Sequence, residues 1–375
     1  MSWIDLDAAT VADAMTSARK IVGTSRMHPV GMTVRIQHER KTTLIERTNI
    51  SDSVRAILSA ASAWPTWGPY IVDAAAFASA VGKTGTVRVA PNPEKTALVF
   101  ASDTGSTSVP LSNVEWPSED RNEYVDAATI AGPELQRVAS IADVARKMGS
   151  DARAVLTAVS IDSDGTVVAT DTYRAHGTRI ADVSRGTLVD GTILHAAVVS
   201  ADANGVHVST TDTDGTGRTL VEWTSVRGPK KNPRTVHYVV SAFRPEGPFP
   251  NIFNVIPTDD VSDSWTVRDA SGTADVLRTF RPSHAGRTPI VFDAMGSAVR
   301  ATLSEDGTER SAILPMSVPN LSDTSMAANA TYIRDAVLHV GDGARVDTFG
   351  ALRPFHFVAD DDAETFALVM PMRIS

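Results

Sequence analysis

The chain has 375 residues, of which 42% are hydrophobic and 21% charged, so it fits a soluble protein of two or three domains. It contains no cysteine, which excludes disulfides, cysteine-ligated zinc and thiol catalysis and fits a reducing cytoplasm. The net charge of −9 argues against strong nucleic-acid binding through bulk electrostatics, although a protein that encircles DNA needs little affinity. No signal-peptide pattern and no apolar run of about 18 residues occurs, so we expect a cytoplasmic protein without a membrane span.

The first third of the chain predicts an amphipathic helix, a hairpin and a second helix. Residues 7–22 place apolar side chains at helical spacing along one face. That stripe consists of Val11, Met15, Ala18 and Val22. Two alternating segments follow at 32–37 and 42–47, and residues 72–89 then read as a helix, a glycine turn and a strand.

The middle third repeats this order. A helix is expected over 133–148, because Pro133 suits the first turn of a helix. Its apolar stripe consists of Leu135, Val138, Ala142 and Ala145. Residues 153–170 read as a hairpin around an Asp-Gly turn, and residues 194–208 as a helix, a glycine turn and a strand.

The last third repeats the order again. A short apolar stripe ends before Pro282, which stops the third opening helix. The stripe consists of Val276, Leu277 and Phe280. A hairpin around Asp306-Gly307 follows, and residues 329–346 give the third helix, glycine turn and strand. Three copies of one pattern predict a tandem of similar α+β domains. The expected domains are 1–122, 123–255 and 256–375.

Sequence motifs for catalysis, cofactors or metals are missing. There is no GxSxG, HExxH, P-loop or GxGxxG pattern, and the nine histidines show no metal-ligand spacing. The Asp-rich stretches 162–165 and 212–215 favour turns, because neither continues into a complete calcium loop. We therefore expect a protein that is not an enzyme and that needs neither cofactor nor metal.

Each opening helix carries basic residues on or near the face opposite its apolar stripe, although the chain is acidic. Two interpretations stay open: an ordinary solvated face, or a helix-lined surface that faces phosphates. The residues concerned are Lys20, Arg137, Arg146, Lys147, Arg278 and Arg281.

The segments VATDTYR at 168–174, GPFPN with VIP within 247–257, and ALVMPMRIS at 367–375 resemble, in this order, motifs of the bacterial DNA polymerase III beta sliding clamps. The C-terminal sequence ALVMPMRIS at 367–375 resembles the family's VMPMR-type tail. VATDTYR at 168–174 resembles its VATDGHR segment, and GPFPN with VIP, within 247–257, resembles its G-x-F-P-D…V-L-P segment. Tyr173 and Thr172 stand where the family usually has His and Gly, and this divergence suits a bacteriophage-encoded clamp.

The resemblance implies three tandem DNA-clamp domains of α+β class, with helices lining a central hole and antiparallel sheets outside. Two subunits would form a head-to-tail homodimer that encircles double-stranded DNA, without sequence preference, and catalyses nothing. DNA polymerase and a clamp loader would bind it through short clamp-binding peptides. Two other readings stay open: a clamp-like, peptide-binding adaptor that does not encircle DNA, and a structural β-rich assembly protein.

The resemblance also implies where such a peptide binds. In this family a pocket between the second and third domains takes a short, mostly apolar peptide. Transferred position by position, the pocket residues are Leu156, Thr170, Thr172, Tyr173, Arg174, Pro250, Val255, Val369, Met370, Pro371, Met372 and Arg373. Thr170 and Arg174 are the expected polar anchors, and the methionines would adapt to varied peptides.

Overall fold

The computed structural model contains two compact units, and each combines two stretches of the chain. The first comprises residues 1–135 and 182–246, and the second comprises residues 136–181 and 247–375. Within the chain, the described residues are 3–23, 28–59, 66–118, 122–148, 153–211, 217–228, 231, 233–281, 288–319 and 324–373.

One order of elements occurs three times: a strand, a helix, four strands, a second helix and three strands. The first copy comprises β1 (Ile4–Asp7), α1 (Ala8–Val22), β2 (Thr33–Glu39), β3 (Thr42–Thr48), β4 (Ser53–Ser59), β5 (Trp67–Asp73), α2 (Ala74–Val81), β6 (Thr86–Pro91), β7 (Ala97–Ser102) and β8 (Gly105–Pro110). The second comprises β9 (Tyr124–Ile130), α3 (Leu135–Arg146), β10 (Ala158–Ile161), β11 (Thr166–Thr170), β12 (Arg174–Arg179), β14 (Thr187–Asp190), α4 (Gly191–Val198), β15 (Val206–Thr211), β16 (Arg218–Arg227) and β17 (Arg234–Phe243), with a short extra strand β13 (Asp182–Val183).

The third copy comprises β18 (Asp263–Val267), α5 (Ala270–Thr279), β19 (Ile290–Met295), β20 (Ala298–Glu305), β21 (Thr308–Ser317), β22 (Ser325–Ala328), α6 (Ala330–Val340), β23 (Arg345–Thr348), β24 (Phe355–Val358) and β25 (Phe366–Val369). Short 3-10 helices lie between these elements: η1 (Pro29–Met32), η2 (Gly132–Glu134), η3 (Ala154–Thr157) and η4 (Ile252–Val255). The repeat that the sequence predicts is therefore present in the order of elements.

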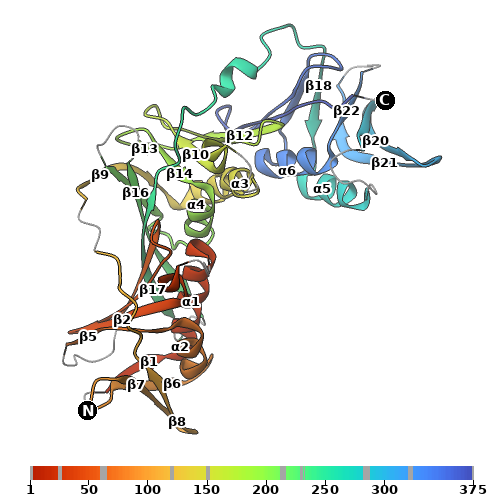
Figure 1. The fold of residues 1–375 in the computed structure, drawn as a ribbon. Helices are drawn as coiled ribbons and strands as arrows, with labels where there is room; N and C mark the ends of the chain where they lie inside the picture. The colour runs from red at the N-terminus through yellow and green to blue at the C-terminus, as the bar shows by residue number, and fades with distance from the viewer. Residues whose placement is uncertain are drawn as a thin grey trace. The chain divides into compact units, whose positions relative to one another are not determined.

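The first unit contains two antiparallel sheets. Nine strands are ordered β13-β9-β15-β16-β17-β4-β3-β2-β5, and four strands are ordered β1-β6-β7-β8. Helix α1 packs against β3, β4 and β17, and α2 lies beside it (Figure 1). The pairing of β17 with β4 joins the second copy to the first, from Val236 opposite Leu58 to Ser241 opposite Ser53.

The second unit contains one long sheet and two neighbouring helices. The eleven strands of this sheet that belong to the second unit are ordered β10-β11-β12-β25-β24-β23-β18-β21-β20-β19-β22. Helices α5 and α6 lie side by side (Figure 1) and pack on a core that includes Trp265, Phe292 and Phe355. The pairing of β12 with β25 joins the second copy to the third, with Arg174 opposite Val369.

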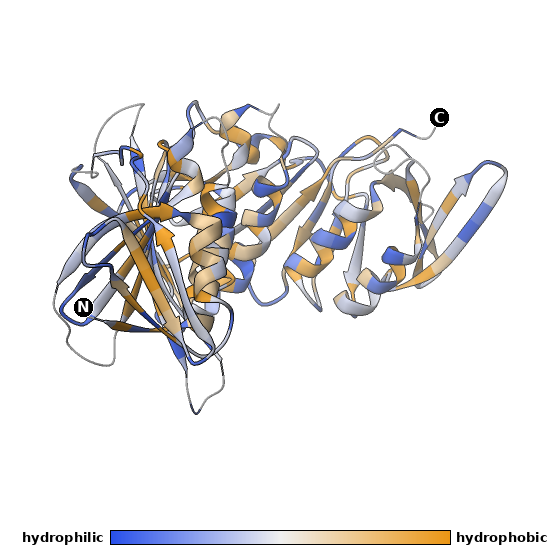
Figure 2. Cartoon of the chain, turned by 60° about the horizontal axis from the view of Figure 1, so that its bottom comes forward, coloured by the Kyte–Doolittle hydropathy of each residue, from blue (hydrophilic) through white to orange (hydrophobic). Residues whose placement is uncertain are grey.

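The first opening helix follows its predicted stripe. All four predicted stripe residues of α1 are buried, and the Asp7 carboxylate accepts a hydrogen bond of 2.7 Å from the Thr10 N–H at the start of this helix. Hydrophobic and hydrophilic residues alternate along the helices (Figure 2), as expected for helices with one buried face. Among the described residues, none of the helices is long and apolar enough to cross a membrane.

The second predicted helix differs from the expectation at its start. The α-helix begins at Leu135, and the preceding turn, Gly132–Glu134, is a 3-10 helix. Pro133 has no N–H to donate within this turn. The Glu134 carboxylate accepts a hydrogen bond of 2.7 Å from the Ala131 N–H. Pro282, the predicted end of the third helix, lies outside the described residues, and α5 ends at Thr279.

Candidate peptide-binding groove

A groove of about 210 Å³ lies in the second unit, where three distant segments of the chain meet. The segments are the turn between β11 and β12, the stretch around η4, and the end of β25. The lining residues are Arg153, Thr170, Thr172, Arg174, Ala175, Pro250, Asn251, Ile252, Val255, Leu368 and Met370. Six of them, Thr170, Thr172, Arg174, Pro250, Val255 and Met370, belong to the set that the sequence predicts.

A tight turn shapes one wall of the groove. The Asp171 carboxylate accepts hydrogen bonds from the backbone N–H groups of Tyr173 at 3.0 Å and Arg174 at 2.9 Å. The Thr170 hydroxyl donates a hydrogen bond of 2.8 Å to the Arg174 carbonyl. The same hydroxyl accepts a hydrogen bond of 3.1 Å from the Thr172 N–H. Thr172 has φ of 74°, a backbone conformation that suits glycine and strains a β-branched residue. The turn therefore holds Thr172 in strain at a groove wall.

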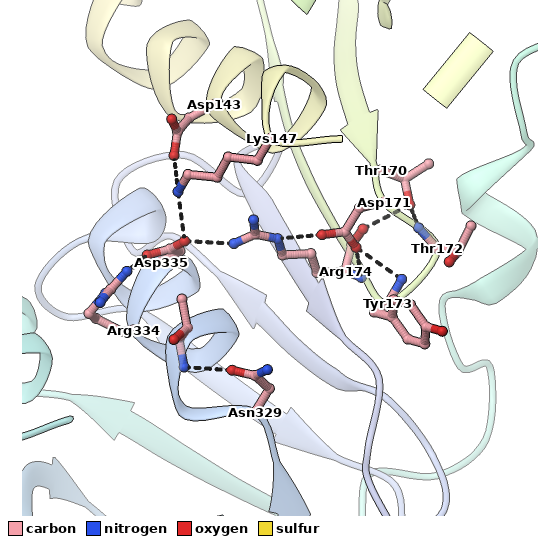
Figure 3. Close-up of polar contacts among 11 residues, drawn as sticks. Asp143, Lys147, Thr170, Asp171, Thr172, Tyr173, Arg174, Asn329, Arg334 and Asp335 are labelled. Atoms are coloured by element: carbon pink, nitrogen blue, oxygen red, sulfur yellow. Dashed lines mark hydrogen bonds and ion pairs between the residues drawn. The ribbon is translucent and has the colours of Figure 1, made fainter. Parts of the chain in front are cut away.

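Arg174 is the buried centre of an ionic network beneath this turn (Figure 3). Its Nε lies 2.9 Å from Asp171 Oδ2, and its Nη1 lies 2.6 Å from Asp335 Oδ2. The guanidinium also lies over the Tyr332 ring, 4.5 Å from its centroid. Burial opposes the charge of Arg174, but Asp335 and Asp171 outweigh burial and raise its pKa.

Asp335 connects this arginine to Lys147, which directly follows α3. Its Oδ2 lies 3.4 Å from Lys147 Nζ, and its Oδ1 lies 2.7 Å from Arg334 Nη2 (Figure 3). Burial raises the pKa of Asp335, but the bonds from Arg334 and Arg174 outweigh burial and keep the pKa below its usual value. The polar groups of Thr170 and Arg174, expected as anchors for a peptide, are thus engaged in holding the wall itself.

The other wall is apolar. Leu368 and Ile252 pack in a small buried cluster with Val168, Ala175 and Phe366. Val255, by contrast, is 43% exposed at the groove edge. Apolar side chains of this kind gain free energy when a bound group removes them from water. The groove therefore offers an apolar wall to a bound group.

The expectation that Val369 lines the groove is wrong. Val369 is fully buried in the separate core that contains Trp265 and Phe355. Successive side chains of a strand point to opposite faces, so the groove receives its neighbour Leu368.

Other predicted residues lie outside the lining. Leu156 is buried in η3, and Tyr173 is 62% exposed. Met372 donates its backbone N–H to the Ala327 carbonyl at 2.7 Å, so the tail is bound to β22 beyond Met370. Pro371 and Arg373, the neighbours of Met372 in the sequence, are likewise outside the lining.

Sequence reasoning missed five lining residues. These are Arg153, Ala175, Asn251, Ile252 and Leu368. Leu368 could have been found from strand alternation, and Ile252 and Asn251 stand inside a segment that the resemblance had already marked. Arg153 precedes η3 and carries no sequence signal for this role.

The predicted DNA-facing cations fall into two groups. Arg137 contacts Asp361 at 2.7 Å and Asp362 at 2.8 Å, Arg146 and Lys147 both pair with Asp143, and Arg278 pairs with Asp275. Lys20 and Arg281 are exposed and have no ion pair within the described ranges. Four of the six charges are therefore neutralised locally by carboxylates.

The fold resembles solved bacterial sliding clamps along its whole length. The beta sliding clamp of C. crescentus aligns with a TM-score of 0.80 and 14% identity, covering 100% of this chain and 99% of that chain. The beta subunit of DNA polymerase III from Thermotoga maritima aligns at 0.78 and 14% identity, covering 100% of both chains. The corresponding subunit from Pseudomonas aeruginosa aligns at 0.76 and 14% identity, covering 99% of this chain and 100% of that chain.

No protein-family model matches the sequence, and a search of curated proteins found no match. The structural likeness nevertheless extends over the entire chain. The protein has the mixed α+β fold, with extensive antiparallel sheets, of the bacterial DNA polymerase III beta sliding clamps, which confirms the fold class expected from the sequence.

Proposed function

We propose that this protein is a DNA sliding clamp: a homodimeric ring of six domains that encircles duplex DNA and tethers a polymerase, without catalytic activity. The observation that carries the proposal is the match of the fold to sliding clamps over the whole chain. The threefold order of elements supports three domains per subunit, with boundaries near residues 122 and 255.

Ring closure in this proposal uses the first domain of one subunit and the third domain of the next. Strand β8 ends its four-stranded sheet and is mostly exposed, so its outer edge can pair with another chain. Such a head-to-tail contact is heterologous, and two copies of it close a ring. The groove at 170–175, 250–255 and 368–370 then receives apolar peptides of the polymerase and the loader.

Retention on circular DNA tests encirclement. The protein is first diluted until its subunits separate. It is then concentrated in the presence of nicked circular plasmid, and the mixture is passed over a sizing column in high salt. We expect plasmid-bound protein that is released when a restriction enzyme linearises the plasmid, because a closed ring is held by topology. Electrostatic binding falls steeply with salt. Loss of the protein from circular plasmid in high salt would contradict the proposal and favour an adaptor that does not encircle DNA.

A further inference from the structure

A second groove lies between α1 and α2 in the first unit. It has a volume of about 420 Å³. Its lining residues are Val11, Ala12, Met15, Thr16, Arg19, Met32, Arg47, Ala74, Ala75, Ala78, Val81, Gly82 and Lys83. Three of these described residues are cationic and none is acidic, although the whole chain has a net charge of −9.

Arg47 is the unusual member of this set. It is 4% exposed, its Nη2 donates to the Gly31 carbonyl at 2.9 Å, and its buried Nε has no hydrogen-bond partner. Within the described ranges, no carboxylate forms an ion pair with Arg47. Burial, followed by repulsion from Arg19, lowers its pKa. A buried charge without a counterion is costly, so an unpaired guanidinium here calls for an explanation.

Arg174 provides the comparison inside the same chain. It is buried to the same extent as Arg47, at 4% exposure, but two carboxylates neutralise it. A ligand in the groove can supply the counterion that Arg47 lacks among the described residues. Because Arg47 lines the groove, a ligand in the groove can reach it.

The rim supplies two further cations. Arg19 lies in the last turn of α1, and Lys83 follows Gly82, the C-cap of α2. Basic residues at helix C-termini often serve only to complement the helix dipole, which would account for these two. It does not account for Arg47, which lies in β3. Met15 and Val81 make part of the lining apolar, and an ionic contact is stronger in surroundings of lower polarity.

We propose that this groove binds a phosphate group, with Arg47 at its base and Arg19 and Lys83 at its rim. Three cations suit an oxyanion that carries more than one charge and several acceptor oxygens better than they suit a single carboxylate. The phosphate could belong to a free phosphate or to the backbone of duplex DNA. The DNA alternative rests on the proposed function, whereas binding of free phosphate requires neither the ring nor the peptide groove.

Titration calorimetry of the full-length protein with inorganic phosphate, against chloride at equal ionic strength, tests the site. We expect one phosphate per chain and at least about tenfold weaker binding in Arg47→Met, since hydrogen bonds to charged groups are worth that much. Arg19→Ala and Lys83→Ala should each weaken binding by about threefold. Lys41→Ala is the control, because Lys41 is an exposed cation of the same unit outside the groove, and it should bind like wild type.

Absence of phosphate binding, or equal binding by Arg47→Met, would overturn the site. Equal weakening by Lys41→Ala would also overturn it, because bulk charge would then explain the effect. If Arg47→Met does not fold, the double variant Arg19→Ala with Lys83→Ala decides by the same criteria.

Duplex DNA then distinguishes the two sources. If the backbone supplies the phosphate, DNA competes with inorganic phosphate, and Arg47→Met lowers the log–log salt slope of DNA binding by about 0.9. If the source is free phosphate, the variant loses phosphate binding while its DNA binding and salt slope stay those of wild type.

Discussion

His176 and His339 form a buried pair beside the ionic network of Arg174. Their rings stack with centroids 4.7 Å apart and planes 11° from parallel. His339 donates its Nε2–H to the Gly177 carbonyl at 3.0 Å, and its Nδ1 contacts the Ser140 hydroxyl. The charged groups that act on the pair are all cations, namely Arg137 from α3, Lys147 just beyond it, and Arg174 from β12. The pair is therefore held in the neutral state.

The two pKa values move in the same direction. Burial lowers the pKa of His339 to about 4, with a further lowering by Arg137, while the bond to Gly177 opposes the shift. Burial and then His339, Arg174 and Lys147 lower the pKa of His176 well below its usual range. An unfolded histidine has a pKa of about 6.5, so the unfolded chain binds these protons first as the pH falls.

We therefore predict an acid-sensitive stability that depends on this pair. The stabilisation is complete above about pH 6.5 and is lost progressively between about pH 6.5 and 4, with His339 alone contributing about 3 kcal/mol. Urea unfolding at pH 7.5, 6.0 and 5.0 measures it. His339→Gln should flatten this pH dependence, and exposed His207→Gln should leave it unchanged. An identical slope in His339→Gln and wild type would contradict the assignment.

At the scale of elements, turns and ion pairs between residues close in the sequence could be predicted from the sequence. The turn at Asp306 and Gly307 has φ of 51° and 73° at these residues, as an Asp-Gly hairpin turn requires. The pairs Asp143–Arg146 and Asp275–Arg278 lie three residues apart on their helices, so they too were within reach of sequence reasoning.

Long-range pairings were not readable in this way. Arg137 and its partners Asp361 and Asp362 are more than 220 residues apart in the chain. The three segments of the groove were predicted, but Val369 and Met370 were both expected to line it, although neighbouring residues of a strand point to opposite faces. The lining contains Met370 and Leu368, and not Val369.

Peptide binding can be tested at Met370, just after β25, with Met372 as the control residue. Met370 lines the groove and Met372 does not, although both belong to the C-terminal tail. Met370→Ala should raise the Kd for a fluorescent peptide from the C-terminus of the cognate polymerase by about tenfold, because apolar contact area is lost. Met372→Ala should bind the peptide like wild type. Equal affinities of the two variants in a fluorescence titration would show that the groove is not the peptide site.

At the scale of the whole molecule, the proposed ring fixes the mass in solution. One chain has a mass of 39.8 kDa, so a dimer has twice 39.8, or 79.6 kDa. We expect native mass spectrometry and small-angle scattering to give this mass at micromolar concentration. A mass of 39.8 kDa by both methods would contradict the ring and favour a monomeric adaptor.

The strand ladders that join the copies have a mechanical consequence. β17 and β4 are antiparallel over six opposed pairs of residues, and β12 and β25 over four. A force along these strands loads all hydrogen bonds of a ladder in shear at once, whereas a force at one end peels them apart one by one. Each joint is thus stiff against sliding and weaker against peeling.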